Sequence, residues 1–178
     1  HTRRGLLSRM MDRLLRDSHA HGKLAATLIA SETPIYRRFG FGLATETVSM
    51  SLTSRDATPW RVAPGPGSMR LLEQGEILDT VPEVYERAAR WRVGTISRPD
   101  WYWPRLLSGA TEPSSRLHGK GTFVAVHTGA DGVDDGYVHY VVQWEEGFAN
   151  NPTGSGTVRD LWGSSPQVEL DLWRDLLG

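Results

Sequence analysis

The stretch from Thr58 to Gly67, TPWRVAPGPG, most constrains how this chain of 178 residues can fold. Proline lacks a backbone N–H and fixes φ, while glycine leaves the backbone free, so a stretch rich in both interrupts helices and strands. We therefore expect a linker at residues 58–67. It separates a first part, residues 1–57, from a second part, residues 68–178.

The first part begins with an amphipathic pattern. Apolar residues recur with helical spacing over Arg3–His21, with charged residues between them, which predicts a helix that ends at Gly22. The elements expected next are a buried, parallel strand at Leu24–Ala30, a short helix at Pro34–Phe39 and a strand at Glu46–Leu52. A helix, a strand, a short helix and a second strand make half of an α/β unit.

The second part mixes helices and strands in a different order. We expect strands at Met69–Glu73, Thr122–His127, Tyr137–Trp144 and Gly156–Trp162, and helices at Val81–Val93, Pro99–Leu107 and Pro166–Leu177. Between two of the strands, Asp131–Gly136 superficially matches a calcium loop, but valine stands at ligand positions, so we interpret it as a hairpin turn.

The bulk composition is that of an ordinary globular protein, with 39% hydrophobic and 23% charged residues. The formal net charge of -1 gives no electrostatic ground for binding nucleic acid or an anionic membrane. No stretch approaches the roughly 20 apolar residues of a membrane span. The absence of cysteine excludes disulfides and a thiol nucleophile, and it fits a cytoplasmic location.

Two short motifs carry the possible chemistry. Arg3-Arg4-Gly5 opens the first predicted helix, where unpaired N–H groups and the helix dipole favour an anion such as a phosphate. By spacing alone, the arginines could equally be solvated and Gly5 incidental. In SETPIYRRFGFG, Tyr36 either fills a core or moves a proton, and Phe39-Gly40-Phe41-Gly42 packs and turns the chain beside it.

Together, TRRGLLSRMMDRLL and LIASETPIYRRFGFG resemble the GNAT acetyltransferase superfamily, and within it the Eis-type (enhanced intracellular survival) N-acetyltransferases. The resemblance continues more loosely through SMRLLE, VYERAARWRVG and LWRDLLG, so it covers most of the chain. It implies an acetyl-CoA pyrophosphate loop at Arg3, Arg4, Gly5 and Leu6, a cofactor-proximal serine at Ser31 and a general acid at Tyr36. Thr2 departs from the Arg or Gln that usually begins this loop.

The resemblance also predicts the domain organisation. Residues 1–57 would be the latter half of an acetyl-CoA-binding GNAT domain, and residues 68–178 most of a second, GNAT-like domain. The second domain's counterpart of the cofactor loop, Gly163-Ser164-Ser165-Pro166-Gln167, lacks arginines, so we expect no acetyl-CoA there. The chain begins and ends beside helices, which we interpret as cuts through a larger, homo-oligomeric polypeptide, with these residues alone inactive.

The expected function is acetyl transfer from acetyl-CoA to a primary amine, of the aminoglycoside or lysine type. Alternatives are a non-catalytic scaffold or binding module, and an acyltransferase of other specificity. The general base is expected outside the chain, at a distant C-terminal carboxylate. Weaker candidates for a carboxylate near the site are Glu32, Glu145 and Glu146. His19 and His21 are weak candidates for metal ligands. The seven tryptophans could pack a core or line a pocket.

Overall fold

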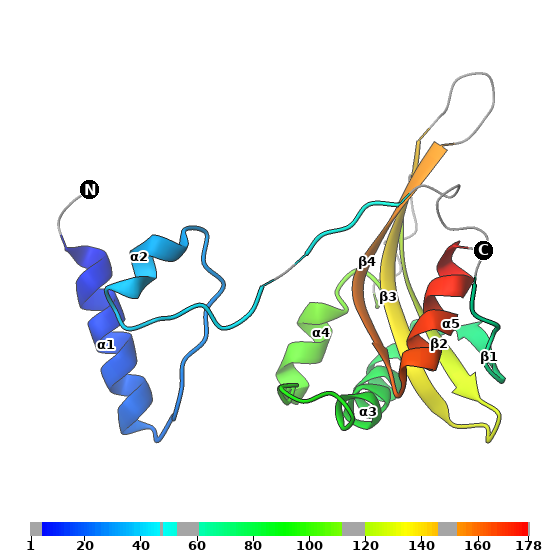
Figure 1. Cartoon of the computed structure of the whole chain (residues 1–178), viewed down its shortest axis with the longest axis horizontal. Coiled ribbons are helices and arrows are strands. Elements are labelled where there is room, and N and C mark those ends of the chain that lie inside the picture. The colour runs from blue at the N-terminus through cyan, green and yellow to red at the C-terminus, as the bar shows by residue number, and fades with distance from the viewer. Residues whose placement is uncertain (1–4, 47, 53–60, 112–119, 146–152, 178) are drawn as a thin grey trace. The chain divides into compact units, whose positions relative to one another are not determined.

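The computed structural model describes residues 5–46, 48–52, 61–111, 120–145 and 153–177. The chain divides into two compact units, His1–Ser51 and Leu52–Gly178 (Figure 1). Of the predicted linker, residues 58–60 lie outside the described part, and residues 61–66 form neither helix nor strand. Within the second unit this stretch is anchored, because the backbone N–H of Gly65 donates to the Asp171 carboxylate at 3.0 and 3.1 Å.

The first unit holds two helices, α1 at Leu6–Ala20 and α2 at Thr33–Arg37. The predicted end of α1 is confirmed: Gly22 has φ +71°, the left-handed conformation that glycine adopts without strain. Its N–H donates to the His19 carbonyl at 2.9 Å, and the Lys23 N–H donates to the Ser18 carbonyl at 3.0 Å. The charged face of α1 carries exposed Arg13–Asp17 and Arg16–Asp12 pairs one turn apart.

The two strands predicted for the first unit are wrong. Residues 24–30 are not a strand, and neither are residues 48–52. A strand needs a neighbour that pairs with its N–H and C=O groups, and no described residue of this unit supplies one. Leu24 and Ile29, expected to be buried, are 104% and 102% exposed. Apolar character alone was therefore insufficient to define a buried strand.

The second unit is a four-stranded sheet with helices on both faces. The strands lie in the order β1-β2-β3-β4, and every neighbouring pair is antiparallel. The elements are β1 (Gly67–Leu71), α3 (Ile77–Ala89), the 3-10 turn η1 (Asp100–Tyr102), α4 (Trp103–Leu106), β2 (Lys120–Gly129), β3 (Asp134–Glu145), β4 (Thr153–Gly163) and α5 (Pro166–Leu177).

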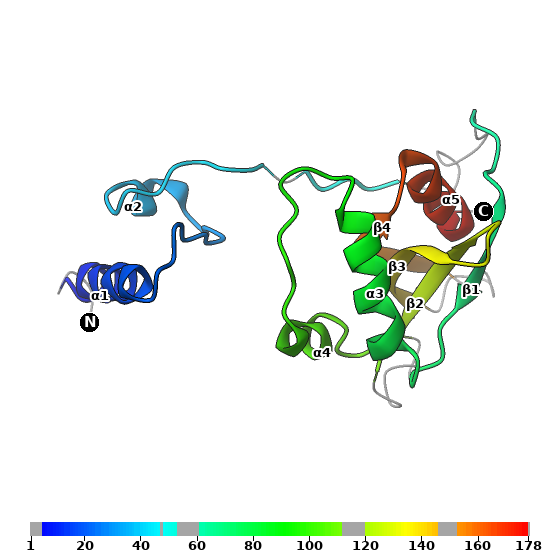
Figure 2. The ribbon, with the colours of Figure 1, turned by 90° about the horizontal axis from the view of Figure 1, so that it is seen from below.

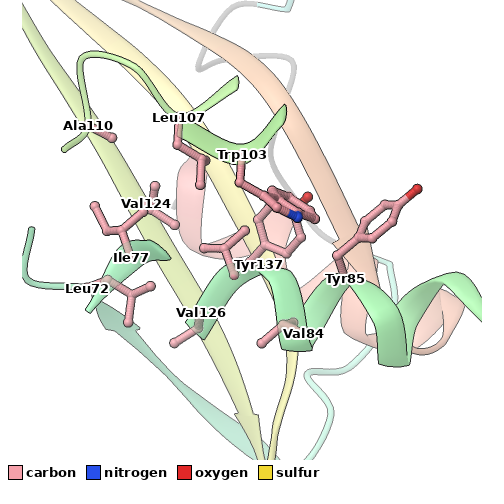
Figure 3. Close-up of a cluster of buried hydrophobic side chains, with 11 residues drawn as sticks. Leu72, Ile77, Val84, Tyr85, Trp103, Leu107, Ala110, Val124, Val126 and Tyr137 are labelled. Atoms are coloured by element: carbon pink, nitrogen blue, oxygen red, sulfur yellow. The ribbon is translucent and has the colours of Figure 1, made fainter. Parts of the chain in front are cut away.

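Strand alternation sends side chains to two separate cores. Val124, Val126 and Tyr137 meet α3 and α4 on one face, and Figure 3 shows this cluster. Ala125 and Val138, one residue along, meet α5 on the other face. Figures 1 and 2 show α5 across the sheet from α3 and α4. Among the described residues, every large buried apolar side chain except that of Met11 therefore lies in the second unit.

Several predicted boundaries shift. Helix α3 begins four residues before the predicted Val81, because the buried side chains of Ile77 and Val81 extend the packed face and Pro82 is accommodated inside the helix. The predicted helix at Pro99–Leu107 is split between η1 and α4. Asp131–Gly136 is confirmed as a hairpin connection: the Gly132 N–H donates to the Gly129 carbonyl at 2.9 Å, between antiparallel β2 and β3.

Within the described ranges, no helix has the length and apolar character needed to cross a membrane.

Candidate functional site

The start of α1 is open. Gly5 is its N-cap residue, with φ +66°, and no side chain caps the first turn. The first turn holds no acidic residue, and apart from its chain neighbours and the helix backbone no atom of the described residues lies within 4 Å of the position that a Cβ on Gly5 would take. Free N–H groups with the positive end of the helix dipole suit an anion. The predicted partners Arg3 and Arg4 lie outside the described residues.

Tyr36 lies in α2, in the same unit as Gly5. Its ring is partly buried and meets Phe41 edge-on, with ring centroids 6.2 Å apart and planes at 76°. The turn that brings Phe41 back passes through Gly40, at φ +86°. The expectation that Phe-Gly-Phe-Gly packs and turns beside Tyr36 is confirmed.

The remaining predicted cofactor residues lie on the surface of this unit. Ser31 is exposed and stands just before Glu32, the N-cap residue of α2. Leu6 is 45% exposed. The glutamate makes no side-chain cap hydrogen bond, although its position at a helix start matches the alternative that we considered for it. Gly5, Leu6 and Ser31 are therefore exposed in this unit, and Tyr36 is half-buried.

The start of α5, the expected counterpart in the second unit, is closed. Ser165 caps it by accepting from the Val168 N–H at 3.3 Å through Oγ and from the Glu169 N–H at 3.1 Å through its carbonyl. Pro166 has no N–H to offer. The first turn carries the Glu169 carboxylate, which pairs with the Arg92 guanidinium. An anion at this position would meet satisfied amides and a like charge.

Two residues of the segment after α3, Trp91 and Arg92, also contact the chain at the start of α5. The Trp91 indole N–H donates to the Gly163 carbonyl at 2.5 Å. The Arg92 guanidinium lies over the Trp162 ring, 4.6 Å from its centroid. Gly163 itself packs against α5 so closely that a Cβ there would lie 2.8 Å from the Glu169 nitrogen. Shape and charge therefore both disfavour a phosphate at this helix start.

The second unit contains a polar cluster that our sequence analysis missed. Arg98 donates two hydrogen bonds to the Asp160 carboxylate, at 2.6 and 3.1 Å, and one to the Tyr137 hydroxyl at 3.0 Å. That hydroxyl donates to Asp160, as does the Trp162 indole N–H at 2.8 Å. The Arg98 guanidinium also lies over the Tyr85 ring, 4.1 Å from its centroid.

These contacts perturb the titration of the cluster. Burial opposes charge on Arg98, but the hydrogen bond to Asp160 and the charge interactions with Tyr137, Asp160 and Tyr85 together outweigh it and raise the pKa of Arg98. Burial and the Asp160 charge raise the pKa of Tyr137. The cluster is therefore a fixed ion pair with a neutral phenol at physiological pH. Only its long-range pairing in the fold reveals it, since Arg98 and Asp160 are 62 residues apart.

The weaker candidates do not gather into a site. Among the described residues, no group of three or more His, Asp or Glu side chains could hold a metal ion, so His19 and His21 form no such centre. Glu145 ends β3, and Glu146 lies outside the described part. Trp103 is core, at 4% exposure, whereas Trp101 is 70% exposed.

The described cavities of the second unit are polar. The larger, about 660 Å³, lies between β1, α3 and the β2–β3 turn, and Arg70, Arg87 and Asp134 line it. Arg70 donates to the Asp134 carboxylate at 2.9 Å, and Arg87 donates to the Asp134 carbonyl at 3.0 Å. Both arginines of this cavity are thus already paired.

Comparisons with known proteins bear on both units. Models of the acetyltransferase (GNAT) domain match residues 1–44 and, separately, residues 94–178. An uncharacterized N-acetyltransferase of Streptomyces griseus is 34% identical over 99% of this chain and 43% of its own length. N-acetyltransferase Eis of Mycobacterium bovis is 32% identical over 100% of this chain and 42% of its own.

Solved structures agree with this. The crystal structure of Eis1 from Mycobacterium abscessus matches with a TM-score of 0.75 and 32% identity, over 99% of this chain and 42% of that chain. An Enterococcus faecalis protein described as a probable N-acyltransferase matches at a TM-score of 0.67; at 17% identity this shows the fold alone. The chain spans less than half the length of these relatives.

The chain therefore belongs to the GNAT acetyltransferases. Within that superfamily its homologues include the Eis N-acetyltransferases, which confirms the resemblance drawn from the motifs around Gly5 and Tyr36.

Proposed function

We propose that this chain is part of an acetyl-CoA-dependent N-acetyltransferase that acts on a primary amine. Residues 1–57 form the latter half of the acetyl-CoA-binding domain, and residues 68–178 form a second GNAT-like domain. The separate GNAT matches to residues 1–44 and 94–178 support this division. The observation that carries the proposal is the open, uncapped start of α1 at Gly5.

At that start the pyrophosphate of acetyl-CoA accepts hydrogen bonds from the first free N–H groups of α1. Gly5 has no side chain to hold the phosphate away. Beyond its chain neighbours and the helix backbone, no atom of the described residues lies within 4 Å of where its Cβ would stand. Arg3 and Arg4 supply positive charge by their positions in the sequence, and Ser31 lies near the cofactor. These roles follow the GNAT pattern.

The transfer itself needs a single displacement. The neutral amine nitrogen attacks the thioester carbonyl carbon, a C–N bond forms, and the C–S bond breaks as the carbonyl re-forms. The departing CoA thiolate takes a proton from the Tyr36 hydroxyl, and the new amide loses one proton to a base. Positioned proton transfer of this kind contributes about 10²–10⁴ in rate.

The second domain does not bind acetyl-CoA in this proposal. The Ser165 cap, the Glu169 carboxylate and the Trp91 contact support that assignment, because each occupies or repels the place of a phosphate at α5. This domain serves as a scaffold for the enzyme.

The test is acetyl transfer by the intact protein to a panel of amines that includes aminoglycosides and lysine peptides. Tyr36→Phe should lower kcat by about 10²–10⁴ while the Kd for acetyl-CoA is unchanged. Tyr102→Phe, in the second unit, is the matched control and should retain full activity. A protein that binds acetyl-CoA yet acetylates nothing would favour the scaffold alternative, and turnover with longer acyl-CoAs would favour the other acyl specificity.

A further inference from the structure

His139 is a buried histidine with unmet polar atoms. It lies in the middle of β3, is 3% exposed, and neither ring nitrogen has a hydrogen-bond partner among the described residues. Buried polar atoms are nearly always paired, so an unpaired imidazole in a sheet interior needs an explanation. Nothing in the proposed acetyl transfer uses this side chain.

His139 lies next to the Arg98 cluster in the sheet, because its partner on β4 is Asp160. In register, His139 stands opposite Asp160 of β4 and opposite Val124 of β2, and the β4 register slips just beyond it. Alternation puts its side chain on the same face as Tyr137, toward α3 and α4. The titratable or charged groups of this neighbourhood are Asp160 and Arg159 from β4, Tyr137 from β3, Tyr85 from α3 and Arg98 from the segment after it.

Asp160 holds the segment between α3 and η1. Arg98, on that segment, donates two hydrogen bonds to its carboxylate, and the Tyr85 hydroxyl donates to the Ile96 carbonyl at 2.6 Å. The same segment turns apolar side chains outward, with Val93 101% and Ile96 74% exposed. The Trp91 hydrogen bond to Gly163 and the Arg92–Glu169 pair hold the start of this segment, whereas the Asp160 carboxylate holds its end through Arg98.

We propose that His139 and Asp160 form an acid-sensitive latch, in which a proton taken up by His139 draws the Asp160 carboxylate away from Arg98 and loosens residues 95–99. The imidazole takes one proton from solvent and becomes a cation, with no other bond made or broken. When a carboxylate interacts with two cations, it binds each of them less strongly than it would bind a single cation. Protonated His139 would therefore weaken the bond between Asp160 and Arg98.

The direction of the effect follows from burial. Burial lowers the pKa of His139, and the nearby Asp160 charge opposes this only in part. The unfolded or loosened chain therefore binds the proton more readily than the closed one. Attachment of the segment is complete above about pH 6.5, the ordinary histidine value, and is lost as the pH falls from there through the lowered pKa.

Hydrogen exchange of the intact protein at pH 7.5 and pH 5.5, corrected for the intrinsic pH dependence of exchange, tests the latch. Amides of residues 95–98 should exchange several-fold faster at pH 5.5 than at pH 7.5, while those of α5 keep their protection. His139→Leu should abolish the difference. His127→Asn is the matched control: His127 is equally buried but already bonded to Asp135 at 2.6 Å, and this variant should respond as the wild type does.

Two further variants keep the test decisive if His139→Leu folds poorly. His139→Gln, which is polar and does not titrate, should also remove the pH response. Asp160→Asn should loosen residues 95–99 at both pH values, because the charge that holds Arg98 is gone. Wild-type protection that is unchanged at pH 5.5, or a pH response that persists in both His139 variants, would overturn the proposal.

Discussion

Two helices of similar amphipathic character, α1 and α5, begin in opposite ways. At α1 the N-cap is a glycine and no described side chain caps the first turn. Apart from the helix backbone and the chain neighbours, no atom of the described residues lies within 4 Å of where a Cβ on Gly5 would stand. At α5 the Ser165 cap, the Glu169–Arg92 pair and the Trp91 indole fill the same place. A helix start becomes an anion site only when the chain leaves its amides free and its dipole unopposed.

The two units that contain these helices also differ in how much apolar surface they bury. The second unit packs two cores against the faces of its sheet, whereas the first has Met11 as its one buried large apolar residue among those described. Stability and fixed geometry therefore reside in the second unit, and the candidate chemistry resides in the first. The following predictions test that division, beginning with the largest effect.

Arg98→Ala should destabilise the second unit by about 3–5 kcal/mol, because it leaves the Asp160 carboxylate buried beside the Tyr137 hydroxyl without its cation. Urea unfolding followed by tryptophan fluorescence measures the change. An unfolding free energy within about 1 kcal/mol of the wild type would mean that the pair is solvated and that the apolar cores alone hold the unit.

Gly5→Val should raise the Kd for acetyl-CoA by about tenfold, or about 1.4 kcal/mol, since a branched side chain both strains a residue at φ +66° and stands where the phosphate approaches. Isothermal titration measures it. Gly22→Val, at φ +71° and the other end of α1, is the control for strain alone. If both variants bind acetyl-CoA as the wild type does, the α1 start is not the phosphate site.

Ser165→Ala should cost about 1 kcal/mol of stability through loss of the α5 cap, and it should leave acetyl-CoA binding unchanged. Thermal unfolding and titration of the same sample report both quantities. A weaker affinity for acetyl-CoA in this variant would contradict the closed state of the α5 start.

Arg13→Ala should change stability least, by about 0.3 kcal/mol, because the Arg13–Asp17 pair is exposed to 79% and 52% and is screened by water and salt. Unfolding at low and high salt measures it. A loss above about 1 kcal/mol would show that the charged face of α1 contributes packing as well as solvation.

Elements whose signal is local were predicted well from the residues alone. Helix α1 and its end at Gly22, α5 at Pro166–Leu177 and the hairpin at Asp131–Gly136 all follow from periodicity and turn chemistry. The motifs around Gly5 and Tyr36 likewise indicated the GNAT superfamily before the fold was known.

Features that depend on distant partners could not be predicted in this way. Leu24–Ala30 has the composition of a buried strand but no paired neighbour in its unit. The Arg98–Asp160 pair, the unmet nitrogens of His139 and the closure of α5 by Trp91 each join residues far apart in the chain. The sequence by itself determined helices α1 and α5, the end of α1 at Gly22 and which family motifs the chain carries. Only the tertiary structure decided which polar groups meet and which strands pair, because hydrogen bonds and buried charges depend on partners that folding alone brings together.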